Sequence, residues 1–223
     1  MRELWEGVLA IGALLVCVIP HEVAHGWMAY RLGDPTAKWA GRLSLNPIRH
    51  LDPIGSLLLP AALLILRRLF GFPIVFGWAK PVPINPRYFR DPWQGMLWVA
   101  LAGPATNFGM ALVAAGLGRG LIALGLVNPW VLYFLGMVVL LSLVLGAFNL
   151  IPVPPLDGSR VLSYFLPLRW RLQLARLEQW GLVIVMVLLL IGALELIFRG
   201  AYGAFVQLVG FRWLGIVHLA GLF

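Results

Sequence analysis

Long apolar runs limit the folds open to this chain more than any other feature of its sequence. Of its 223 residues, 61% are hydrophobic and 12% are charged, which is about half the charged share of a typical soluble domain. A helix needs ~20 apolar residues to cross the hydrocarbon core of a bilayer. Apolar segments occur at residues 4–30, 54–66, 96–117, 129–149, 182–198 and 204–222. We therefore expect an all-α, polytopic membrane protein.

Two of these segments depart from a simple span. The last contains Arg212 and Trp213, which suit the level of lipid headgroups, so it forms either a span, which we favour, or an interfacial helix. Residues 54–66 are short for a span and include Pro60. Residues 69–79 are rich in Gly, Pro, Phe and β-branched residues and indicate extended chain. We expect these two stretches to form a re-entrant hairpin or short strands; the alternative is a tilted span followed by a loop.

The basic residues indicate membrane topology and argue against nucleic-acid binding. The net charge is +8, but Lys and Arg are dispersed over the connections between apolar segments, as is typical of loops that face anionic lipid. The basic connections are those at 31–50, 67–90 and 160–176, whereas the connection at 118–128 carries one arginine. All three basic connections lie on one side only if residues 54–66 do not cross the membrane. The charge pattern therefore favours a re-entrant segment.

One motif in the first apolar segment carries chemistry. His21, Glu22 and His25 form an H-E-x-x-H motif. Residues four apart lie on one face of a helix, so both imidazoles can reach one Zn²⁺. Glu22 is rotated by ~100° from His21 and can instead take a proton from a water that the metal activates. Four histidines and five glutamates in this length give about 0.002 chance matches, so the motif predicts a zinc site.

A catalytic zinc needs three protein ligands, and Asp157 is the best candidate for the third. It lies in a proline-rich stretch, residues 149–158, where the prolines forbid regular helix and allow the chain to fold against the site. If residues 54–66 do not cross, His25 and Asp157 lie on the same side of the membrane, as a shared metal requires. The ligand set and the charge pattern thus predict the same topology.

Other residues of metal-ligating types have simpler explanations. Glu195 precedes Arg199 by one helical turn, an order that favours an ion pair. Asp34 and Asp52 lie beside turn-forming prolines. His50 is expected to be a surface residue, and His218 a buried or interfacial one. Cys17 is expected to be a packing residue. None of these rivals Asp157 as the third ligand.

In combination, these motifs resemble those of the site-2 protease family of intramembrane zinc metalloproteases, in its compact form without PDZ or CBS domains. The resemblance covers most of residues 8–165 and rests on three stretches in the same order, 21–25, 103–107 and 149–158. It implies a three-helix catalytic core whose first and last helices hold the two histidines and the aspartate on zinc, with Glu22 as the base.

The resemblance also implies roles outside the ligand set. Asn149 corresponds to an asparagine near the metal, where its amide could hold substrate or an oxyanion; alternatively, it satisfies backbone groups at a helix end. Asn107 either contacts substrate or bonds backbone groups freed at a Gly-Pro kink. The stretch at 77–85 corresponds to a region near the active site, where extended backbone could pair with an unwound substrate strand. The residues expected to make that contact are Lys80, Pro81 and Val82.

We therefore expect an intramembrane zinc metalloprotease that cleaves peptide bonds in or near transmembrane segments, in regulated intramembrane proteolysis. A single membrane-embedded peptidase domain is expected over residues 1–223, with a catalytic core at about 4–165 and additional helices at about 178–222. The alternative is a membrane metal transporter or sensor with the same ligands, which has no need of Glu22. The expected partners are a transmembrane substrate and lipid. The compact chain leads us to expect a prokaryotic cytoplasmic membrane, with the active site towards the cytoplasmic side.

Overall fold

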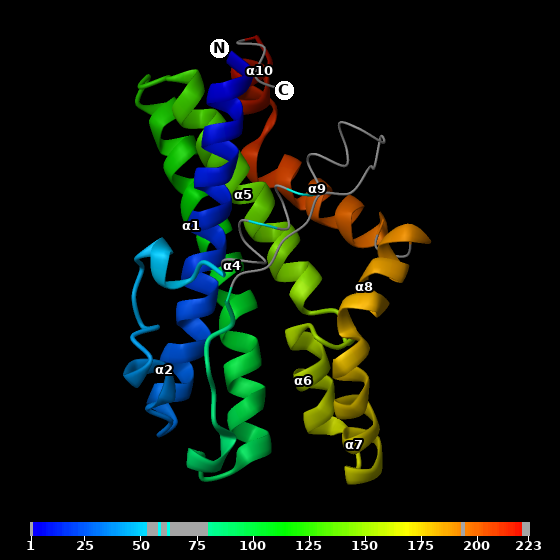
Figure 1. Cartoon of the computed structure of the whole chain (residues 1–223). Coiled ribbons are helices and arrows are strands. Elements are labelled where there is room, and N and C mark those ends of the chain that lie inside the picture. The colour runs from blue at the N-terminus through cyan, green and yellow to red at the C-terminus, as the bar shows by residue number, and fades with distance from the viewer. Residues whose placement is uncertain (1, 53–57, 59–61, 63–79, 193–194, 220–223) are drawn as a thin grey trace.

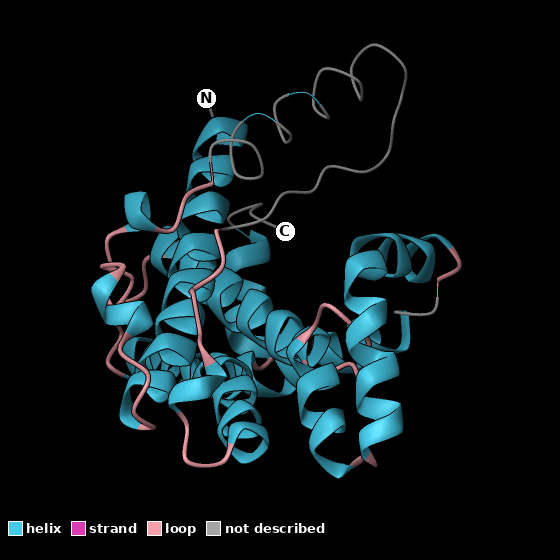
Figure 2. Cartoon of the chain, turned by 60° about the horizontal axis from the view of Figure 1, so that its bottom comes forward, coloured by secondary structure: helices cyan, strands magenta, loops and turns pink. Residues whose placement is uncertain are grey.

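The computed structural model describes residues 2–52, 58, 62, 80–192 and 195–219, and every regular element among them is helical (Figure 2). These elements are α1 (Arg2–Arg31), α2 (Thr36–Trp39), η1 (Pro47–Arg49), η3 (Pro86–Tyr88), α4 (Pro92–Ala123), α5 (Pro129–Asn149), α6 (Asp157–Phe165), α7 (Leu168–Leu177), η4 (Glu178–Trp180), α8 (Gly181–Leu190), α9 (Glu195–Val209) and α10 (Phe211–Leu219). The predicted all-α membrane class is confirmed. The predicted re-entrant or strand segment at 54–79 lies outside the described residues, two isolated positions excepted.

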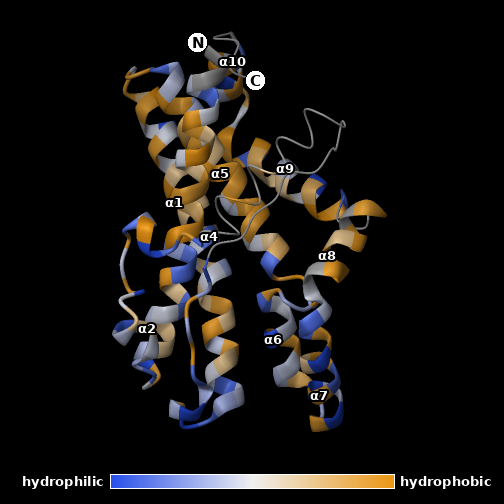
Figure 3. Ribbon diagram, viewed as in Figure 1, coloured by the Kyte–Doolittle hydropathy of each residue, from blue (hydrophilic) through white to orange (hydrophobic). Residues whose placement is uncertain are grey.

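Three long helices, α1, α4 and α5, form the centre of the molecule and pack against one another (Figure 1). Among the described helices, these three are each long and apolar enough to cross a membrane alone. The sequence also determines where two of them begin. The side chains of Asp91 and Asn128 accept hydrogen bonds from the first turns of α4 and α5, and a proline follows each of them. Hydrophobic residues are concentrated in the upper parts of this bundle, whereas the lower ends are more hydrophilic (Figure 3).

The connection between α1 and α4 begins and ends on the same side of the bundle. α1 runs downwards and α4 upwards in the view of Figure 1. The chain after α1 meets the chain before α4, because the backbone N–H of Asn85 donates to the buried Asp34 carboxylate at 2.6 Å. The described parts of the basic connections at 31–50 and 67–90 therefore share a side, as the charge pattern predicts.

The C-terminal segments differ from the prediction. A single span at 182–198 is wrong, because α8 ends at Leu190 and a new helix begins at Glu195. Between them Gly192 has a φ of 71°, the left-handed conformation that commonly ends a helix. The described part of 204–222 is not one continuous helix either. Gly210, with a φ of 82°, separates α9 from α10, and the two helices are bent by 95° into a broken span or re-entrant loop.

Trp213 is buried in the helical core. Its side chain is 1% exposed, and its indole N–H donates to the backbone carbonyl of Leu132 at 3.0 Å. A side chain at Gly118 would overlap the Trp213 ring, so the glycine makes room for it on α4. α10 thus packs on α4 and α5 and closes one end of the hydrophobic core.

Candidate metal centre

The H-E-x-x-H motif lies in the second half of α1, and both of its histidines are buried there. The one-turn spacing places the rings on the same face of the helix, as the sequence predicts. The Nε2 atoms of His21 and His25 are 3.0 Å apart, and the two rings lie at 87° to each other. Two imidazole nitrogens therefore converge on one point within a helix long enough to span a membrane.

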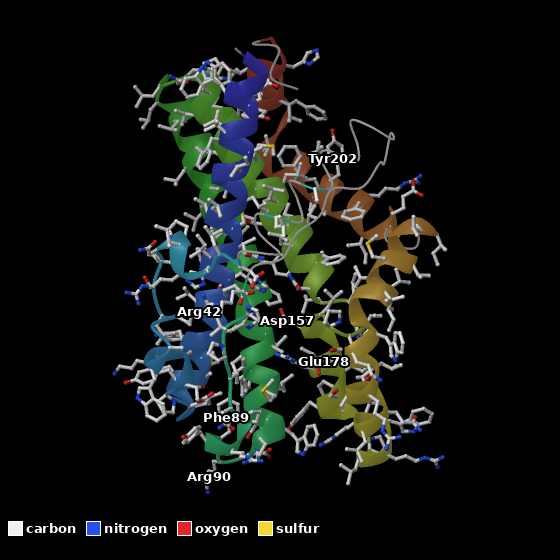
Figure 4. All side chains as sticks on the ribbon, in the orientation of Figure 1. Arg42, Phe89, Arg90, Asp157, Glu178 and Tyr202 are labelled. Atoms are coloured by element: carbon white, nitrogen blue, oxygen red, sulfur yellow. The ribbon has the colours of Figure 1, made fainter. Side chains whose placement is uncertain are left out.

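Asp157, the first residue of α6, brings a carboxylate to the same point. Its Oδ2 atom lies 3.4 Å from Nε2 of His21 and 3.2 Å from Nε2 of His25. Figure 4 shows Asp157 where α6 begins. The next residue, Gly158, makes this approach possible, because a side chain there would overlap the backbone carbonyls of Leu150 and Ile151. The structure thus brings together the three residues that the sequence singled out as ligands.

The chemistry of these three donors fits Zn²⁺. One ligand atom from each residue lies within 4.8 Å of the others. Two imidazoles and one carboxylate are a donor set found in catalytic zinc sites, where a fourth position stays open. Burial raises the pKa of Asp157, but hydrogen bonds with His21 and His25 lower it to about 2. The carboxyl group is therefore ionised at neutral pH, as a ligand to a cation must be.

One face of α4 supports both histidines from behind. Nδ1 of His25 lies 2.7 Å from the backbone carbonyl oxygen of Val99, and Nδ1 of His21 lies 3.1 Å from Nδ2 of Asn107. Gly103 lies between those two positions, and a side chain there would overlap the His25 ring. These three residues are each four apart, so they lie in a row along one face of the helix. A backbone carbonyl has no signature in a sequence, which is why sequence reasoning missed the contact at Val99.

Glu22 points to a different neighbour, the extended segment at residues 80–85. Its Oε2 accepts a hydrogen bond from the backbone N–H of Val82 at 3.3 Å. The guanidinium of Arg42 donates to the carbonyl oxygens of Lys80, at 2.5 Å, and Pro81, at 3.1 Å. One peptide unit, the carbonyl of Pro81 and the N–H of Val82, therefore connects Arg42 to Glu22. The predicted substrate-contacting residues thus lie beside the predicted base.

Two residues beside this segment were misjudged from the sequence. Arg42 is 5% exposed, although it belongs to the basic connection at 31–50 that the charge pattern assigns to the surface of the membrane. His50 was expected at the surface, and this prediction is wrong, because its side chain is 2% exposed. Its Nε2 lies 2.6 Å from the carbonyl oxygen of Ser44, and its own carbonyl accepts from the N–H of Lys80 at 3.0 Å. Both are buried because the loop that carries them folds against the extended segment, a contact that local sequence does not encode.

Asn149 and Asn107 occupy different surroundings. Asn149 is the last residue of α5, and its Nδ2 donates to the carbonyl of Leu145 at 3.0 Å, as expected of a residue that satisfies a helix end. Asn107 is fully buried and contacts His21. That position favours a role behind the histidine over direct contact with substrate.

Three of the rival ligands, Cys17, Glu195 and Asp34, make other contacts, as the sequence predicts. Cys17 is buried with its Sγ 3.2 Å from the hydroxyl of Ser142 on α5. Glu195 pairs with Arg199 at 2.7 Å on the exposed surface of α9. Asp34 accepts a hydrogen bond from the backbone N–H two residues later, as turn residues do.

Comparison with known proteins gives consistent matches. Residues 122–192 match the family model described as Peptidase family M50. The chain is 37% identical over 180 residues to "Putative zinc metalloprotease YwhC" of Bacillus subtilis, covering 78% of this chain and 77% of that protein. It is 35% identical over 192 residues to "Putative zinc metalloprotease Rip2" of Mycolicibacterium smegmatis, covering 84% of this chain and 69% of that protein. The corresponding Rip2 of Mycobacterium tuberculosis is 32% identical over 184 residues, or 82% and 67% of the two chains. No solved structure matches the chain.

Proposed function

We propose that this chain, which belongs to peptidase family M50 and is a zinc metalloprotease, cleaves peptide bonds in or near the transmembrane segments of membrane proteins. The position of the ligand cluster carries this proposal. Two of the proposed ligands lie within α1, a helix long and apolar enough to span a membrane. A peptide bond that is cleaved at this cluster has to enter the membrane to the depth of the ligands in α1. We propose regulated intramembrane proteolysis as the process that this cleavage serves.

His21, His25 and Asp157 are the proposed zinc ligands. Zinc, when bound, supplies a Lewis acid that polarises a peptide carbonyl and lowers the pKa of water. The role of the three residues is to hold this charge in one place, with the histidines fixed by α4 and the aspartate delivered by the turn before α6. Burial of the cluster excludes bulk water and strengthens each of these interactions.

Glu22 is the proposed general base and acid. It lies next to His21 in the sequence but on a neighbouring face of α1, so it can serve the reacting water without displacing a ligand. The carboxylate would take a proton from the attacking water and deliver it to the leaving amine. The N–H of Val82, which donates to Glu22, supports this role because it fixes where the carboxylate points.

Substrate is proposed to bind along the extended segment, at Lys80, Pro81 and Val82. Extended backbone can pair with a peptide strand that has unwound from its helix. Because Val82 already contacts Glu22, a strand paired there would lie beside the base. Asn149 is proposed to bind substrate or the developing oxyanion; its amide nitrogen donates one hydrogen to the carbonyl of Leu145 and has a second one for this role.

The remaining proposals concern the whole chain. We propose that residues 1–223 form one peptidase domain, with its catalytic core at about 4–165 and additional helices at about 178–222. We also propose a prokaryotic cytoplasmic membrane, with the site towards the cytoplasmic side, since the basic connections gather at the end of the bundle where α1 ends and α4 begins. Because the chain belongs to a peptidase family, we favour a protease over the alternative, a metal transporter or sensor.

The decisive experiment measures zinc content and cleavage of a single-span membrane substrate in reconstituted vesicles. His21→Ala and Asp157→Ala are expected to lose zinc and activity together. Glu22→Gln is expected to keep zinc and lose about 10²- to 10⁴-fold in cleavage rate, the usual contribution of general acid–base catalysis. Full zinc content in Asp157→Ala would refute the third ligand. If wild type cleaves a soluble peptide as fast as the membrane substrate, the proposed substrate class is wrong.

A further inference from the structure

We propose that Asn107 is a positioning residue: it holds His21 in the tautomer and orientation that zinc binding requires, and it does not bind substrate. This inference rests on the proposed ligand set. It gives Asn107 a different role from the one that the resemblance implied, and it makes zinc affinity, more than substrate affinity, the quantity that this side chain controls.

The two nitrogens of the His21 ring face different partners. Nε2 faces the cluster, 3.0 Å from Nε2 of His25 and 3.4 Å from Oδ2 of Asp157. Nδ1 faces away from the cluster, 3.1 Å from the amide of Asn107. The asparagine side chain is 0% exposed, so substrate cannot touch it without a rearrangement of α1 and α4. Its position allows it to act on His21 alone among the three proposed ligands.

The protonation state of a ligating histidine determines what its partner must be. A neutral imidazole that binds a metal through Nε2 carries its proton on Nδ1 and has to donate it. His25 meets this requirement, because its Nδ1 lies 2.7 Å from the carbonyl oxygen of Val99, which can only accept. His21 needs an acceptor in the same way, and the amide oxygen of Asn107 is the group that can provide one.

An orphan atom shows that this acceptor is available. In the structure the nitrogen of the Asn107 amide faces His21, while its buried Oδ1 has no hydrogen-bond partner among the described residues. The nitrogen and oxygen of an amide have nearly the same shape, so a half-turn about the last side-chain bond exchanges them. We infer that in the zinc-loaded protein Oδ1 faces Nδ1 of His21. The exchange gives Oδ1 a donor and prevents two donors from facing each other, and it turns Nδ2 to the side where Oδ1 now has no partner within the described part of the chain.

The two histidines thus differ in how they are held. A main-chain carbonyl holds His25, and no substitution removes it. A side chain holds His21, so this contact can be deleted. Partners that orient a ligating histidine typically contribute about 10- to 100-fold to metal affinity or activity.

The experiment compares Asn107→Leu, which keeps the volume but has no acceptor, with Asn107→Asp, whose carboxylate always accepts. Zinc affinity is measured on the purified full-length protein by competition with a chromogenic chelator. The visible spectrum of the Co²⁺-substituted protein reports the ligand geometry. We expect Asn107→Leu to weaken zinc binding by about 10- to 100-fold and to alter the Co²⁺ spectrum. Asn107→Asp is expected to restore both, and the KM for a membrane substrate at saturating zinc should stay the same in both variants.

Thr106→Val is the matched control, because the Thr106 hydroxyl donates to the Ala102 carbonyl of its own helix. It is expected to bind zinc as wild type does. Wild-type zinc affinity in Asn107→Leu with a raised KM would overturn the proposal in favour of substrate binding. If Asn107→Leu fails to fold, folded Asn107→Asp decides, and loss of zinc from it would also overturn the proposal. Full zinc in His21→Ala would instead refute the ligand set itself.

Discussion

Two neighbouring faces of α1 serve the candidate site in different ways. His21 and His25 are one turn apart and face α4, a continuous helix. Glu22 and Gly26 are also one turn apart, and they face the extended segment through Val82. The ligands are thus supported by regular helix packing, whereas the base is supported by irregular chain.

The supports also differ in how they are fastened. The α4 support consists of a helix face in which Gly103 lets the backbone approach the histidines. The extended segment is held from outside by buried charged side chains, Arg42 at one end and Asp34 at the other. Regular helix packing leaves the metal ligands little freedom to move, whereas the extended segment, which is held only by side chains, can adjust to a substrate. Metal affinity and cleavage rate should therefore respond to different substitutions.

The largest effect is expected from Gly103→Ala. The new methyl group would overlap the His25 ring and lie 2.6 Å from Cε1 of His21, so α4 or both rings must move. A displacement of ~1 Å in a catalytic geometry can cost about 100-fold in rate, and here it affects the ligands themselves. We expect loss of stoichiometric zinc, measured by metal analysis of the purified protein, and loss of cleavage with it.

The matched control for this substitution is Gly109→Ala on the same helix, where a methyl group would meet no atom within 4 Å. It is expected to keep zinc and activity. Stoichiometric zinc in Gly103→Ala would contradict a rigid α4 support. It would mean that the histidine side chains can move to accommodate the methyl group and still bind the metal.

A smaller effect, confined to catalysis, is expected from Arg42→Met. Loss of the Arg42 guanidinium frees the carbonyls of Lys80 and Pro81, so the N–H of Val82 no longer holds Glu22 in place. We expect cleavage to fall by about 10- to 100-fold, on the same geometric reasoning, with zinc content unchanged. Arg90→Met, which removes an exposed arginine, serves as the control and should be silent. Zinc loss in Arg42→Met would mean that the two supports are not separable.

The smallest effect is expected from Gly26→Ala. The methyl group would lie 2.9 Å from Cδ2 of Leu43 and from Cγ1 of Val82, and 3.1 Å from Cβ of Ala37, so these neighbours have to give way slightly. Such overpacking typically costs about 1–3 kcal/mol, so we expect a lower thermal midpoint and a cleavage rate reduced by less than about 10-fold. Gly116→Ala, at an open position, measures the background. A rate equal to wild type would show that the segment does not act through its packing on α1.

Much of this molecule could be predicted because the information is local. The span predicted at 129–149 has the bounds of α5, since Asn128 and Pro129 mark its start. The spacing of His21 and His25 fixes their common face, and charge and topology together identified Asp157 as their partner, although its role as a ligand remains a prediction.

The rest depends on contacts that sequence does not display. A glycine inside an apolar run hardly changes its hydropathy, so the breaks at Gly192 and Gly210 were invisible. The burial of Trp213 depends on the space opposite Gly118, which only the fold shows. Arg42 has the same sequence signature as an exposed basic loop residue, and only the fold shows what it contacts.

The proposed ligands are also separated in time. Two of them belong to α1, and the third begins α6, after both α4 and α5. A chain that the ribosome has completed only as far as α5 therefore holds an incomplete metal site. Membrane insertion has to bring α6 back to α1 before zinc is bound fully, and zinc then stabilises that assembled state over any other. On the proposed ligand set, the protease stays inactive while it is being made, because its metal site is still incomplete.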